Sequence, residues 1–73
     1  MSDAIYSKDH KYIVEKLKQA RLDIGLDQDQ VAGLLKRTQS YVSKIESGQR
    51  KIGVVQLKAF AHIYKKPIEF FIN

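Results

Sequence analysis

The absence of cysteine from a chain of 73 residues is the feature that most restricts its fold. Disulfide bonds and cysteine-based zinc sites, which stabilise many proteins of this size, are both excluded. Stability then depends on one small core with short local contacts, or on help from a second subunit. Apolar residues at 44% and charged residues at 29% are typical of a single globular domain and argue against wholesale disorder.

Apolar spacing and turn residues divide the chain into five expected helices. An amphipathic stripe over about 9–24 predicts the first, which Gly25 ends. Asp27 and Thr38 are capping residues ahead of a second helix from Gln28 and a third over 39–47, which Gly48 closes. A fourth is expected over 54–64, and a last short helix over 67–71 with a proline in its first position. No segment alternates long enough for a strand, so the fold class is all-α.

The fourth helix carries two apolar stripes where one would serve a single buried face. The expected inward stripe is Val54, Leu57, Phe60, Ala61 and Tyr64, and the second is Val55, Ala59 and Ile63. The last helix could cover the second stripe within the chain, or part of this surface could form a two-fold dimer interface. The two accounts are compatible, and we expect both. The candidate interface residues are Ile63, Phe70, Phe71 and Ile72.

The net charge of +5 is concentrated in the centre of the sequence. Residues 1–30 carry −1, residues 52–73 carry +2, and residues 31–51 carry +4 from five basic residues against Glu46 alone. A solvated basic surface would explain this, and so would an anionic partner such as a nucleic acid.

The third helix favours the nucleic acid. With Val42 and Ile45 facing inward, a rotation of about 100° per residue places Ser40, Ser43, Lys44 and Ser47 on the outer face. Gln39 lies on the flank and projects beyond the helix end. This face has no acidic residue, whereas an ordinary exposed helix often pairs Glu with Lys. Short polar side chains with one lysine suit an element that enters a major groove.

Two stretches resemble the helix-turn-helix of the phage-repressor and Cro-like (XRE) family: Gly25-Leu26-Asp27-Gln28-Asp29-Gln30-Val31-Ala32 and Thr38-Gln39-Ser40-Tyr41-Val42-Ser43-Lys44-Ile45-Glu46-Ser47-Gly48. The resemblance extends over about 11–72. It implies a compact, five-helix, lambda-repressor-like domain in which helices two and three form the motif. It also implies a homodimer whose third helices enter the major groove of double-stranded operator DNA.

The resemblance also implies roles for individual residues. The expected base-reading residues are Gln39, Ser40, Lys44 and Ser43. The expected phosphate contacts are Gln28, Arg37, Thr38, Ser47, Gln49, Arg50 and Lys51. Arg21 and Glu46 match an internal ion pair between helices one and three, the alternative being two independent surface charges.

Three positions near the motif are less clear from the sequence. Lys36 and Arg37 stand where the family usually has a glycine and a small apolar residue. The turn must therefore accommodate a non-glycine residue, with a positive φ as one way to do so. Tyr41 could pack on the domain, lie along a sugar or touch a thymine methyl, and the sequence does not decide among the three.

Other classes of function are poorly supported. His10 and His62 have no partner at metal-ligand spacing, and no phosphate loop, nucleophile elbow or paired carboxylates occur. We expect no enzyme activity, metal, cofactor or small-molecule ligand. No apolar run could span a bilayer and Met1-Ser2-Asp3 is unlike a signal peptide, so a cytoplasmic, nucleoid-associated protein is expected.

The sequence therefore predicts a flexible segment over 1–8 and a helix-turn-helix domain over 9–73. The expected function is a homodimeric, sequence-specific DNA-binding regulator on a pseudo-palindromic operator, of the phage or plasmid repressor or restriction-modification controller type. The alternative is an antitoxin-like module that uses the fold to bind a protein partner. The operator, the direction of regulation and the genetic system are not revealed.

Overall fold

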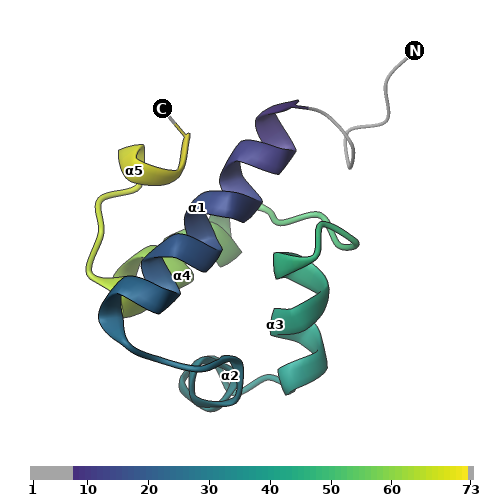
Figure 1. The fold of residues 1–73 in the computed structure, drawn as a ribbon, viewed down its shortest axis with the longest axis vertical. Coiled ribbons are helices and arrows are strands. Elements are labelled where there is room, and N and C mark those ends of the chain that lie inside the picture. The colour runs from purple at the N-terminus through teal and green to yellow at the C-terminus, as the bar shows by residue number, and fades with distance from the viewer. Residues whose placement is uncertain (1–7, 73) are drawn as a thin grey trace.

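The computed structural model describes residues 8–72, which form five helices (Figure 1). They are α1 (Lys8–Ile24), α2 (Gln28–Leu35), α3 (Gln39–Glu46), α4 (Val54–Tyr64) and α5 (Glu69–Ile72). No residue in 8–72 lies in a strand, and the expected all-α class is confirmed. Of the expected flexible segment, residues 1–7 lie outside the described residues, and Lys8 is the first residue of α1.

Local hydrogen bonds explain where α2 and α3 begin. The Asp27 carboxylate accepts from the Gln30 backbone N–H at 2.7 Å, and the Gln30 side-chain oxygen accepts from the Asp27 N–H at 2.9 Å. This reciprocal capping box satisfies two N–H groups that would otherwise lack partners at the start of α2. At the start of α3, the Thr38 hydroxyl accepts from the Tyr41 backbone N–H at 3.2 Å. Both expected caps are confirmed.

Four of the residues in 8–72 adopt the left-handed backbone conformation at turns. Gly25 and Gly48 have φ of +83° and +82°, which glycine adopts without strain. Lys36 and Lys65 each have φ of 58° and follow the last residues of α2 and α4. The sequence pointed to Lys36 as a non-glycine turn residue, but it did not identify Lys65.

Two details of the C-terminal half differ from the expectation. The last helix begins at Glu69 and not at Pro67, whose carbonyl precedes the helix and accepts from the Phe70 N–H at 3.0 Å. Val54 was expected on the inward stripe of α4, yet it is 72% exposed. It occupies the first helical position, one turn ahead of Leu57, where no described element packs over it.

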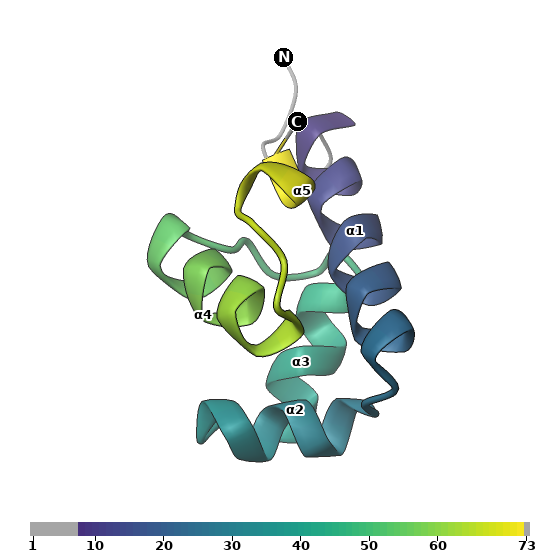
Figure 2. The ribbon, with the colours of Figure 1, turned by 90° about the vertical axis from the view of Figure 1, so that its left-hand side faces the viewer.

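All five helices contribute to one core (Figure 2). Its buried side chains are Leu17, Ala20, Val31, Ala32, Val42, Ile45, Leu57, Phe60, Ala61, Tyr64 and Phe71. Helix α2 packs across α3, and α5 lies against α1.

Phe71 was expected at the dimer interface, and the structure shows that this expectation was wrong. Its side chain is fully buried within the chain, because α5 turns it into the core shared with α1. It therefore cannot present its ring to a second copy. Of the other candidates, Ile63 and Phe70 are half-buried and Ile72 is 53% exposed.

Candidate nucleic-acid interface

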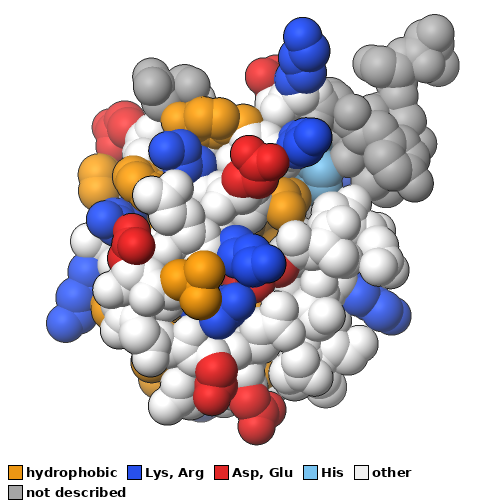
Figure 3. All heavy atoms as spheres, in the orientation of Figure 1, with side chains coloured by type: hydrophobic (Ala, Val, Ile, Leu, Met, Phe, Trp, Pro, Cys, Tyr) orange, Lys and Arg blue, Asp and Glu red, His pale blue; other side chains and the backbone are white. Residues whose placement is uncertain are grey.

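The outer face of α3 is polar and accessible. Gln39, Ser40 and Lys44 are exposed and Ser43 is half-buried. Figure 3 shows mainly uncharged side chains over α3, with acidic side chains at the lower edge, over α2. Helix α3 therefore presents hydrogen-bonding groups without a negative charge among them.

The outer face of α3 carries no acidic side chain because Glu46 is turned toward the interior of the protein. Val42 and Ile45 are fully buried, and they fix which side of the helix faces the core. Within Gln39–Glu46, all of which the structure describes, Glu46 is the only acidic residue. Its side chain is 4% exposed and lies against α1. A polyanion that approaches α3 from outside thus meets no exposed carboxylate on that helix.

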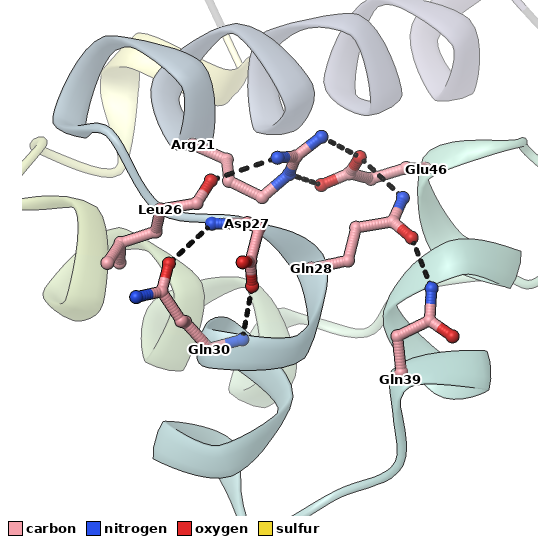
Figure 4. A network of polar contacts seen from close by, with 7 residues as sticks. All are labelled: Arg21, Leu26, Asp27, Gln28, Gln30, Gln39 and Glu46. Carbon is pink, nitrogen blue, oxygen red and sulfur yellow. Dashed lines mark hydrogen bonds and ion pairs between the residues drawn. The ribbon is translucent and has the colours of Figure 1, made fainter.

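Arg21 and Glu46 join α1 to α3 (Figure 4). Arg21 Nε donates to Glu46 Oε2 at 2.7 Å and Nη2 donates to Oε1 at 3.0 Å, a bidentate pair. Arg21 Nη1 also donates to the Leu26 carbonyl at 2.9 Å. The hydrogen bond to Glu46 raises the pKa of Arg21, and burial opposes that rise. The pair therefore fixes α3 relative to α1 with two charges that are both nearly buried.

A chain of hydrogen bonds extends from this ion pair to the start of α3. Gln28 Nε2 donates to Glu46 Oε1 at 3.1 Å, and Gln39 Nε2 donates to Gln28 Oε1 at 2.7 Å. Figure 4 shows Gln28 lying between the other two side chains. The structure thus brings together a residue expected to bind phosphate and one expected to read bases. Sequence reasoning did not anticipate this chain, because its members are 11 and 18 residues apart.

The remaining residues expected at phosphates differ in their accessibility. Two hydroxyls are already engaged with the backbone, since Thr38 caps α3 and Ser47 Oγ donates to the Lys44 carbonyl at 3.1 Å. Four exposed residues flank the two ends of α3: Arg37, Gln49, Arg50 and Lys51. Long, exposed side chains at both margins of the helix could meet a DNA backbone on either side of a groove.

Tyr41 has a role that the sequence did not reveal. The side chain is half-buried against the core, and its ring lies under two guanidinium groups. The distances from its centroid to Arg37 Cζ and Arg50 Cζ are 4.1 and 4.9 Å. The spacing of four residues to Arg37 could have suggested the first contact. Nothing in the linear sequence indicates the second.

Neither a metal site nor a membrane-spanning helix occurs among the residues that the structure describes. Across residues 8–72, no three His, Cys, Asp or Glu side chains lie together as a metal ion would require. No helix in that range is both long enough and apolar enough to cross a membrane.

A family model described as helix-turn-helix matches residues 17–71, which include α2, the turn and α3. The chain belongs to this family. The XRE-type resemblance seen in the sequence is thereby confirmed, and the helix-turn-helix protein is a DNA-binding regulator of transcription.

Two of the solved structures that match this helix-turn-helix protein share its fold over most of this chain. The restriction-modification controller protein C.AhdI from Aeromonas hydrophila is 27% identical with a TM-score of 0.78, over 86% of this chain and 91% of that one. Hydroxypropylphosphonic acid epoxidase from S. wedmorenis is 26% identical with a TM-score of 0.79, over 88% of this chain. The match covers only 34% of the epoxidase, so it carries no argument for that enzyme's activity here. No curated protein matches the sequence.

Proposed function

We propose that this protein regulates transcription as a homodimer that places two copies of α3 in successive major grooves of a pseudo-palindromic operator. The observation that carries the proposal is the outer face of α3, where Gln39, Ser40 and Lys44 are exposed while Glu46 is turned inward to Arg21. A two-fold dimer of this kind spaces its reading helices about 34 Å apart, one turn of B-DNA.

The exposed side chains of α3 have chemistry suited to base edges. The Gln39 amide can pair with N6 and N7 of adenine, and Lys44 can donate to O6 and N7 of guanine. Ser40 can donate or accept, and Ser43 lies beside it at the edge of this face. These four residues would specify the sequence.

Residues at the margins of α3 would fix the register of the complex through phosphates. We assign this role to Gln28, Arg37, Thr38, Ser47, Gln49, Arg50 and Lys51. Contacts of this kind add affinity that falls with salt and carry little sequence information.

The dimer would form through the outer stripe of α4. Val55 is 77% exposed, Ala59 is exposed and Ile63 is half-buried, so the second stripe is only partly covered within residues 8–72. A two-fold axis beside such a stripe lets the same apolar residues of two copies cover one another. A small core without disulfides would gain stability from this burial.

The genetic setting that fits best is a restriction-modification controller, because C.AhdI aligns over 91% of its own length. A protein of this kind would work on the nucleoid in the cytoplasm. It would respond to its own concentration through the dimer equilibrium, because dimer formation depends on concentration.

The deciding experiment is selection of bound duplexes from a random pool, followed by fluorescence anisotropy on the recovered site at several salt concentrations. We expect two inverted half-sites and an affinity that falls steeply with salt. Failure to bind any duplex in a salt-dependent manner would refute the proposal. Recovery of a single half-site bound by a monomer would refute the dimer and favour a protein partner at the α4 stripe.

A further inference from the structure

A basic hollow lies beside α3, at the margin of the face that would read bases, and it shares Ser40 and Lys44 with that face. It has a volume of about 400 Å³, and four cationic side chains line it: Lys36, Arg37, Lys44 and Arg50. The first two come from the turn before α3 and Arg50 comes from the segment after it. No carboxylate occurs among the described residues that line the hollow. Four positive charges around one open depression attract an anion.

Tyr41 forms part of the wall of this hollow and contacts both of its arginines. The ring centroid is 4.1 Å from Arg37 Cζ and 4.9 Å from Arg50 Cζ. Two guanidinium groups that share one ring repel one another, and both belong to exposed residues outside helices. The electron-rich face of the ring attracts each of them. Because Tyr41 also packs against the core, it can hold both guanidiniums relative to α3.

We propose, on the basis of the function proposed above, that Tyr41 is a positioning residue. It holds Arg37 and Arg50 so that the hollow receives the phosphodiester backbone of one DNA strand beside the groove that α3 enters. The ring performs this role and the hydroxyl does not. Lys36 lies in the same hollow and adds a further positive charge.

The chemistry of the hollow favours phosphate over a base edge. A guanidinium stacked on a ring keeps its N–H edge free, and that edge matches two oxygens of one phosphate. The arginines also lie before and after α3 and not on its outer face, which is where backbone contacts occur around a reading helix. A fixed pair of guanidiniums binds with less loss of side-chain freedom than two mobile ones.

The test compares Tyr41→Phe, which keeps the ring, with Tyr41→Leu, which keeps an apolar side chain against the core. Anisotropy is measured at several salt concentrations on the selected operator and on an unrelated duplex. We expect Tyr41→Phe to bind within about twofold of the wild type. Tyr41→Leu should lose about tenfold on both duplexes, with its preference between them unchanged, and its salt slope should flatten by about one unit.

A second aromatic–cation contact provides the control. The Tyr12 ring on α1 lies 5.3 Å from Lys16 Nζ and does not line the basic hollow. Tyr12→Leu should therefore leave the affinity and the salt slope as in the wild type. An equal loss in Tyr12→Leu and Tyr41→Leu would mean a general effect of ring removal and would overturn the proposal.

The outcomes separate this proposal from the proposed function. If the wild type binds DNA and Tyr41→Leu matches it in affinity and slope, the positioning role of Tyr41 is wrong while the regulator stands. If the wild type binds no duplex, the proposed function itself fails, and the DNA-binding role of the hollow fails with it.

A further variant and a spectroscopic readout serve if Tyr41→Leu does not fold. The double change of Arg37→Lys and Arg50→Lys keeps both charges at exposed positions but removes the planar guanidiniums. We expect it to lose about tenfold in affinity on both duplexes. In the free protein, the side-chain N–H signals of Arg37 and Arg50 should show ring-current shifts that Tyr41→Phe retains. Unshifted signals in the wild type, or full affinity in the double variant, would overturn the proposal.

Discussion

Gln39 Nε2 donates to Gln28 Oε1 at 2.7 Å, so the first residues of α3 and α2 are joined by their side chains. Gln28 in turn donates to Glu46, which is held by Arg21. The N-terminal end of α3 is thus connected to a nearly buried ion pair. The bond uses one N–H of the Gln39 amide and leaves its second N–H and its carbonyl, the donor and acceptor that adenine requires.

Replacement of Gln39 by alanine should relax the preference at one base pair of each half-site. The expected loss on the preferred site is about 1 to 3 kcal/mol, because a bidentate base contact disappears. Gln28→Ala should produce a smaller loss at the same base pair, since the Gln39 amide is then no longer oriented. It should also weaken binding to every sequence alike, because Gln28 is proposed to contact a phosphate. Anisotropy on single-base variants of the operator measures both. Gln19→Ala, at an exposed position on α1, is the control. An equal effect of Gln39→Ala at every base pair would contradict the assignment of Gln39 to base reading.

Removal of one partner from the Arg21–Glu46 pair should destabilise the fold. We expect Arg21→Ala to lower the free energy of unfolding by about 3 to 5 kcal/mol, because it leaves the Glu46 carboxylate nearly buried without its cation. The double change of Arg21→Met and Glu46→Leu should recover much of this loss by replacing both charges with apolar groups. Urea denaturation of the three proteins measures the effect. Equal stability of Arg21→Ala and the wild type would show that the pair behaves as two surface charges.

The helix ends of this fold are largely predictable from local sequence. Asp27, Thr38 and Gly48 act within one turn of the chain, so their roles follow from residue type and spacing. The expected inward position of Val54 was wrong, because the apolar period continues to the helix start whether or not another element covers it. Burial of Phe71 likewise depends on where α5 packs.

The candidate site was predictable to a similar degree. Helical periodicity was sufficient to identify the exposed positions Ser40 and Lys44. Periodicity placed Gln39 on the flank, and its accessibility was inferred from its position at the helix end. The contact of Tyr41 with Arg50 and the Gln28–Glu46 hydrogen bond depend on the path of the chain between elements. Spacing along the sequence carries no information on such contacts.

Neutralisation of Arg50 should weaken binding to all sequences alike. We expect Arg50→Gln to flatten the slope of log affinity against log salt by about one unit, because one phosphate contact and its released counterion are lost. Operator and unrelated duplexes should be affected equally. Lys18→Gln, an exposed basic residue on α1, is the charge-matched control and should leave the slope unchanged. A loss confined to one base pair would instead make Arg50 a base-reading residue.

A charge on the outer stripe of α4 should break the proposed dimer. Val55→Glu should shift the protein to a monomer in sedimentation equilibrium and reduce operator affinity, because a carboxylate would be buried between two copies. Leu22→Glu, at an apolar position on α1 that is 58% exposed, is the matched control and should remain dimeric. A dimer that survives Val55→Glu would place the interface elsewhere, and Ile72→Glu then tests the exposed end of α5.

The last prediction uses the identical backbone conformation of Lys36 and Lys65, both at φ 58° and ψ 43°. A left-handed conformation costs a residue with a side chain about 1 to 2 kcal/mol. Glycine avoids this cost but loses more conformational entropy on folding, so substitution by glycine recovers only part of it. Lys36→Gly and Lys65→Gly should therefore each raise the free energy of unfolding by up to about 1 kcal/mol in urea denaturation. Only Lys36 lies in the basic hollow, so only Lys36→Gly should also weaken DNA binding and flatten its salt slope. Equal loss of affinity in both variants would mean that overall charge, and not the position of Lys36 beside α3, determines the effect.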